Sequence, residues 1–105
     1  MKSYTELDSF ESWTLEEKDR FTINVIKCLI LDAVRNAKSG HSGGPLSSAD
    51  FVYILFKEYL KCDPDDDQWF NRDRFVLSPG HESMLLYALL HFMGWMPMDE
   101  IKKFR

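Results

Sequence analysis

The architecture of this chain depends most on the run Arg74-Phe75-Val76-Leu77-Ser78-Pro79-Gly80-His81. Its apolar centre, residues 75–77, favours a short buried strand over 74–78, of the kind found in parallel sheets. The Pro79-Gly80 pair breaks that strand, and the apolar residues that follow predict a helix over 81–92. A buried strand that passes through a glycine turn into a helix predicts the α/β fold class, with this strand as the one clear strand in a mostly helical chain.

A long amphipathic helix is predicted upstream of this run. Thr14 and Glu17 have the spacing of a capping box. Apolar residues then recur at intervals of three and four as far as Ser39, and they cover a wide face that requires burial on more than one side. Gly40 is placed to end this helix in the left-handed conformation. Residues 1–13 lack periodicity and are expected to form an arm or a short turn.

A glycine- and proline-rich loop is expected next, over residues 40–45. Ser47 or Ser48 is expected to cap a second helix, which ends near Leu60.

The last part of the chain predicts a fourth helix. Gly94 is expected to end the third helix, and Pro97 can open a fourth that runs into Arg105. Three or four helices therefore accompany a single strand, 74–78. A lone strand has no partner for its backbone groups, so the sequence indicates an incomplete domain.

Composition limits the possible functions. The 105 residues are 45% hydrophobic and 29% charged, which is typical of a globular chain. The net charge of -4 provides no basic surface for nucleic acid or anionic membranes. Cys28 and Cys62 are expected to be reduced thiols packed as small apolar groups. With no signal peptide and no apolar run near the ~20 residues of a membrane span, we expect a cytoplasmic protein.

Two segments combine glycine with histidine at helix ends: Gly40-His41-Ser42-Gly43-Gly44 and Ser78-Pro79-Gly80-His81. Glycine lets a ligand approach the backbone closely, and the start of a helix attracts anions. Histidine there can donate a hydrogen bond to phosphate or move a proton near neutral pH. Each segment also has a purely structural explanation, a helix cap with a turn for the first and a strand–helix turn with a surface histidine for the second.

The remaining candidate groups predict no chemistry of their own. His91 lies within an apolar helix and is expected to be a packed, hydrogen-bonded structural residue. The histidines are too widely spaced to predict a metal site within this chain. The acidic residues 63–67 lack the glycine and the terminal glutamate of a calcium loop, so a solvated turn is expected.

Both glycine–histidine segments resemble the signatures of one enzyme family. Residues 37–45 resemble the loop near the start of transketolases, usually written with SGHPG, and residues 73–85 resemble the second signature of the same family. The resemblance extends over roughly 19–105 in the same order. It implies that residues 14–105 are an incomplete diphosphate-binding domain of transketolase type, the N-terminal part of a parallel-sheet domain, preceded by the arm 1–13.

The resemblance implies a thiamine-diphosphate enzyme that moves two-carbon ketol units between sugar phosphates. Carried over, His41 is the catalytic and substrate-binding residue, which lies at the substrate channel and assists proton transfer. His81 contacts the cofactor diphosphate, and Gly80 permits its close approach. The resemblance also implies Mg²⁺ or Ca²⁺, whose ligands lie outside this chain, and a homodimeric parent. Whether that parent serves the pentose phosphate pathway or carbon fixation stays open.

This chain departs from the family pattern in two ways. Ser42 stands where the family has proline after the first histidine, so the loop entry is less rigid. The family's diphosphate–metal motif does not occur in this sequence, so the isolated chain is expected to be inactive. The alternative is a non-catalytic helical binding module that uses its broad apolar first helix for docking. A subunit of a split transketolase is a third possibility.

Overall fold

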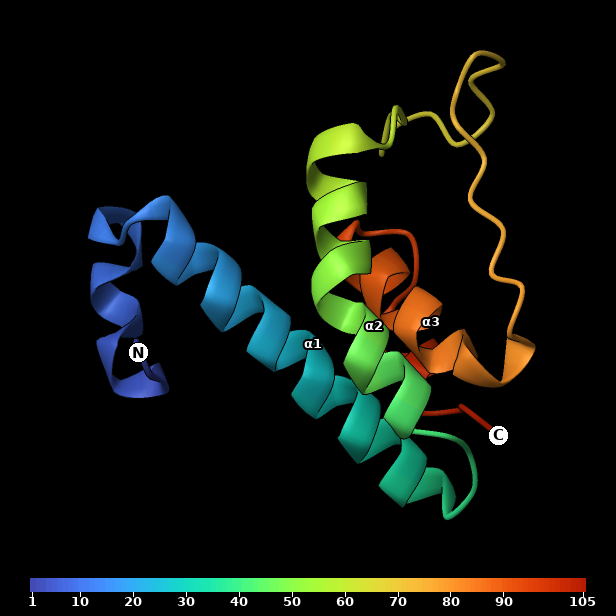
Figure 1. The fold of residues 1–105 in the computed structure, drawn as a ribbon, viewed down its shortest axis with the longest axis horizontal. Helices are drawn as coiled ribbons and strands as arrows, with labels where there is room; N and C mark the ends of the chain where they lie inside the picture. Colours follow the sequence, from blue (N-terminus) through green and yellow to red (C-terminus); the bar gives the residue numbers. More distant parts are fainter.

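A computed structural model describes all residues, 1–105, as a small helical bundle (Figure 1). Its helices fall into one long N-terminal helix, a second helix extended by a π-helical turn, a third helix, and short 3-10 or terminal turns. Their bounds in chain order are η1 (Tyr4–Ser12), α1 (Leu15–Ala37), α2 (Gly43–Ile54), η2 (Leu55–Tyr59), η3 (Gly80–Glu82), α3 (Ser83–Phe92) and α4 (Met98–Ile101).

The capping box predicted at the start of α1 is confirmed. The Thr14 hydroxyl accepts a hydrogen bond from the Glu17 backbone N–H at 3.2 Å, and the Glu17 carboxylate accepts one from the Thr14 N–H at 2.9 Å. The predicted end is wrong, because Lys38, not Gly40, takes the left-handed conformation next to the helix, with φ 52°. The Lys38 N–H closes the last turn on the Arg35 carbonyl, so the chain reverses before it reaches Gly40.

The core lies where α1, α2 and α3 meet. Ile26 and Ile30 of α1 and Met84 and Leu85 of α3 are almost completely buried. Each such side chain stabilises the fold by about 1.5–3 kcal/mol relative to leaving it exposed. No polar or charged residue is buried with them. The remaining members of this apolar cluster are Ala33, Ala49, Val52, Ala88, Leu89 and Ile101.

The N-terminal residues expected to form an arm make a 3-10 helix, η1, docked on the start of α1. Trp13 is only 5% exposed, and its ring lies 5.2 Å from that of Phe21 in an edge-to-face contact. Tyr4 contacts the same Phe21 ring at 5.5 Å. In Figure 1 this helix lies at one end of α1, away from α2 and α3. Aromatic contacts that are local in the sequence therefore hold it.

The second helix begins earlier than predicted. Its first residue is Gly43, with Ser42 as the N-cap, whereas Ser47 or Ser48 was the expected cap. Pro45 therefore lies inside the first turn, where it is buried. Proline is tolerated there because the backbone N–H that it lacks has no partner within the helix. The helical path continues through η2 and ends before Leu60, close to the predicted end.

The strand predicted at 74–78 is absent, and no strand forms anywhere in the chain. The segment belongs to a long irregular connection between η2 and η3 (Figure 1). Phe75 still packs inward, with its ring 5.0 Å from that of Phe56, whereas Val76 is 83% exposed. The prediction of a buried strand is therefore wrong, because no other extended segment of the chain offers this one hydrogen bonds.

The third helix is confirmed, with η3 as its opening turn before α3. Gly94 follows its end with a positive φ of 86°, as a helix terminator does. Pro97 caps α4, but this helix ends at Ile101 instead of running into Arg105.

The two cysteines differ from each other in exposure. Cys28 and Cys62 are both free thiols, but Cys28 is exposed, so its predicted packing in the interior is wrong. None of the helices combines the length and the apolar character needed to cross a bilayer.

A polar contact joins α1 to the second helix beside the core. The Asp19 carboxylate accepts hydrogen bonds from the Tyr53 hydroxyl at 2.8 Å and from Lys57 Nζ at 2.6 Å. Partial burial raises the pKa of Asp19, but the bonds from Lys57 and Tyr53 outweigh it and leave this pKa below its usual 3.8. Burial, with the bond to Asp19, raises the pKa of Tyr53 to about 12.

These shifts predict two pH windows of stability loss. A lowered pKa at Asp19 stabilises the fold above pH 3.8, and this contribution is lost as the pH falls through the folded value. A raised pKa at Tyr53 stabilises the fold below pH 10, and this is lost as the pH rises through about 12. We expect Asp19→Asn to lower the free energy of unfolding by about 1 kcal/mol at neutral pH. In this variant, the free energy of unfolding should also depend less on pH in both windows. Urea titrations across pH test this, and an unchanged profile contradicts it.

Candidate functional site

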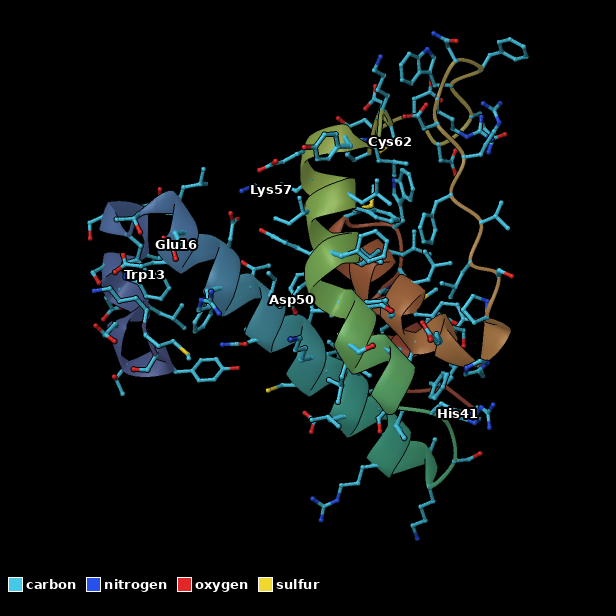
Figure 2. All side chains as sticks on the ribbon, in the orientation of Figure 1. Trp13, Glu16, His41, Asp50, Lys57 and Cys62 are labelled. Carbon is cyan, nitrogen blue, oxygen red and sulfur yellow. The ribbon has the colours of Figure 1, made fainter.

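The structure brings the two predicted histidines together although they are far apart in the sequence. The His41 and His81 rings lie 4.9 Å apart between centroids, at an interplanar angle of 62°, in an edge-to-face contact. His41 comes from the loop between α1 and α2, and His81 from η3. Both side chains are exposed, and Figure 2 shows His41 beside the first turn of α2.

This meeting follows from the packing of the helices. Both α2 and α3 dock on α1 and contact each other. Ala49 of α2 and Ala88 of α3 are fully buried at the centre of the bundle. The loop before α2 and the turn before α3 therefore emerge side by side, and each carries its histidine there.

A third side chain, Glu82, lies between the two segments and was not predicted. Its carboxylate occupies the space where a side chain at Gly44 would lie: a Cβ there would be 2.9 Å from Glu82 Cγ and closer to the carboxylate. The Ser48 hydroxyl lies 3.5 Å from Glu82 Oε2. No local pattern pairs Gly44 with Glu82, because their contact depends on how α2 and α3 cross.

The last residues of the chain brace the His41 loop. The Phe104 ring packs on Gly40, where an added Cβ would lie 3.1 Å from Phe104 Cε2. Arg105 Nη1 donates a hydrogen bond to the Ser39 hydroxyl at 2.8 Å. Gly40 itself has φ 125°, which side chains rarely adopt. The positions of Ser39 and Gly40 are therefore fixed from the C-terminal side.

The turn at Gly80 and His81 has free donors and open space. The Glu82 N–H donates to the Pro79 carbonyl oxygen at 2.8 Å, whereas the N–H groups of Gly80 and His81 have no acceptor in the chain. A Cβ added at Gly80 would meet nothing within 4 Å. Two backbone donors beside an exposed imidazole are a donor set that fits an anion with phosphate oxygens.

The other candidates lie apart from this site. His91 Nδ1 is 2.7 Å from the Met96 carbonyl oxygen in a half-buried position, so its predicted structural role is confirmed. The acidic residues 63–67 form an exposed turn, in which the Asp65 N–H donates to the Asp63 carboxylate and the N–H of the following Gln68 donates to the Asp66 carboxylate. No group of three or more His, Cys, Asp or Glu side chains is arranged to hold a metal ion.

Comparison with known proteins defines the class to which these features belong. The family model described as "Transketolase, thiamine diphosphate binding domain" matches residues 18–105. This range contains most of α1, all of α2 and α3, and both glycine–histidine segments, so the resemblance found in the sequence is confirmed. The chain belongs to this family and corresponds to an N-terminal transketolase segment.

Individual relatives agree with this assignment. Transketolase 1 of Escherichia coli (strain K12) is 52% identical over 83 residues, which cover 78% of this chain and 12% of the relative. The transketolase of Buchnera aphidicola subsp. Schizaphis graminum (strain Sg) is 53% identical over the same shares. The transketolase of Geobacillus stearothermophilus is 48% identical over 88 residues, or 83% and 13%. The chain thus spans about one eighth of the length of these relatives.

The bracing of the His41 loop predicts a difference between two glycines with positive φ. Gly40→Ala strains the backbone and presses on Phe104, whereas Gly94→Ala, at φ 86°, only strains the backbone. We expect Gly94→Ala to cost about 1 kcal/mol and Gly40→Ala about 2–3 kcal/mol of unfolding free energy. Urea denaturation of both variants measures this. Equal losses would show that Phe104 does not brace the loop.

Proposed function

We propose that this chain is part of the diphosphate-binding domain of a transketolase that moves two-carbon ketol units between sugar phosphates. The meeting of His41 and His81 carries the proposal, because the fold brings the two family-like signatures to one place. The complete domain is proposed to be an α/β domain in which residues 74–78 join a parallel sheet. A cytoplasmic homodimer that uses thiamine diphosphate with Mg²⁺ or Ca²⁺ completes the proposal.

Thiamine diphosphate, when bound, supplies the nucleophilic carbon and the electron sink that ketol transfer requires. In this proposal, the residues of this chain hold and orient the cofactor. We place the diphosphate at the turn before α3, where the N–H groups of Gly80 and His81 are free and no side chain obstructs Gly80. The His81 imidazole donates a further hydrogen bond to a phosphate oxygen.

His41 is proposed to serve the sugar substrate. Its exposed imidazole lies next to His81 and therefore next to the place proposed for the diphosphate. An imidazole nitrogen can accept a proton from a sugar hydroxyl and return it. The two residues before His41, Ser39 and Gly40, contact Arg105 and Phe104, which hold the backbone at the start of its loop.

The metal is proposed to bind outside these residues. No cluster of metal-ligating side chains lies near His81, and a doubly charged diphosphate requires a cation beside it. The isolated chain is therefore proposed to be inactive in ketol transfer.

The affinity of the complete polypeptide for thiamine diphosphate tests the proposed diphosphate position. Gly80→Ala has room in the fold, so we expect an unchanged Tm but about tenfold weaker binding of thiamine diphosphate, since the methyl group occupies the approach to the backbone. His81→Ala removes a hydrogen bond to a charged group, and we expect about ten- to hundredfold weaker binding. Calorimetric titration with thiamine diphosphate and MgCl₂ measures both.

His91→Ala is the matched control. It removes the bond to the Met96 carbonyl, so it should lower the Tm while the folded protein keeps its cofactor affinity. If Gly80→Ala and His81→Ala bind thiamine diphosphate as the unchanged protein does, the proposed cofactor site is wrong. The alternative, a helical binding module, would then explain the chain better.

The proposed roles of His41 and His81 can be distinguished by their effects on turnover and on cofactor affinity. We expect His41→Ala to lower kcat by about 10²–10⁴-fold, the usual contribution of a positioned acid–base group, with little change in cofactor affinity. Steady-state ketol transfer at saturating thiamine diphosphate tests this. A loss confined to cofactor affinity would place His41 in the diphosphate site instead.

A further inference from the structure

The Glu82 carboxylate lies in an unusual position. It lies on the backbone of Gly44, in the first turn of α2, although Glu82 itself precedes α3. Glycine is unfavourable in helices compared with alanine, and Gly44 has no positive φ that would require it. The space that Glu82 fills gives a physical reason for glycine at this position.

The start of α2 lacks a cap of its own. Ser42, its N-cap residue, makes no side-chain hydrogen bond, and its first turn contains no acidic residue. Helices favour a negative charge at this end, because their free N–H groups carry partial positive charge. Glu82 brings a carboxylate there from another element, with the Ser48 hydroxyl 3.5 Å from its Oε2 atom.

This contact links the two glycine–histidine segments. Glu82 follows His81 directly, and Gly44 is three residues after His41. We propose that Glu82 is a positioning residue, whose carboxylate anchors the turn before α3 to the first turn of α2 and so sets the spacing of the His41 and His81 rings. Only the purpose of this spacing rests on the proposed function.

The side chain at Gly44 provides a direct test. An added methyl group would overlap the Glu82 carboxylate, and a flexible side chain yields by swinging away. Gly44→Ala should therefore have the same effect as Glu82→Ala. Gly43→Ala is the matched control, because a Cβ at Gly43 meets nothing within 4 Å in the same turn.

The experiment compares nuclear Overhauser contacts between the His41 and His81 ring protons in the ligand-free chain. We expect strong contacts in the unchanged chain and in Gly43→Ala, and weaker contacts in Glu82→Gln, which keeps the shape and one acceptor oxygen of the side chain but removes its negative charge. We expect them to be largely lost in Glu82→Ala and Gly44→Ala. The Tm should fall by about 2–4 °C in Glu82→Ala, as expected for the loss of one helix–charge contact.

The double variant Gly44→Ala/Glu82→Ala decides between anchoring and a general weakening of the fold. If Glu82 acts through Gly44, the double variant should lose no more ring contact or Tm than Glu82→Ala alone. Ring contacts that survive in Glu82→Ala, or losses that add in the double variant, would overturn the proposal. These measurements use no cofactor, so a negative result would reject the positioning role of Glu82 and leave the proposed function intact. Normal cofactor binding in Gly80→Ala and His81→Ala would reject the proposed cofactor site and leave the positioning role of Glu82 intact.

Discussion

The apolar face of α1 determines where α2 and α3 lie. Ile26 and Ile30 are buried by two helices, α2 and α3, which come from separate parts of the chain. Because both helices must cover the same face, their starting turns emerge next to each other. The pairing of His41 with His81 is thus a consequence of hydrophobic burial. The site depends on the core, because the core fixes the positions of α2 and α3.

The glycines at the site differ in what the fold requires of them. Gly40 supplies a backbone conformation with positive φ and a seat for Phe104, and Gly44 leaves room for the Glu82 carboxylate. Gly43 and Gly80 have neither constraint within the chain, because their surroundings are open. Of these two, Gly80 lies at the turn whose backbone N–H groups are free, which agrees with the proposed diphosphate position.

Local patterns in the sequence were enough to predict much of the fold. The capping box at Thr14 and Glu17, the end of α3 near Gly94 and the structural role of His91 all depend on residues close in sequence. The strand at 74–78 failed because a strand requires a partner, and the chain offers none. The start of α2 was missed because proline suits the first turn of a helix as well as a loop. His41 and His81 were identified by their motifs, but Glu82 could not be, since its contact with Gly44 arises only when α2 and α3 cross.

The central claim is that the turn at Gly80 and His81 receives the diphosphate of thiamine diphosphate, with His41 beside it. A crystal structure of the complete polypeptide with thiamine diphosphate and Mg²⁺ tests this most directly. The account predicts a His81 ring nitrogen within about 3 Å of a diphosphate oxygen, with the His41 ring still in contact with His81. A diphosphate bound elsewhere, with His81 turned toward solvent, would contradict it.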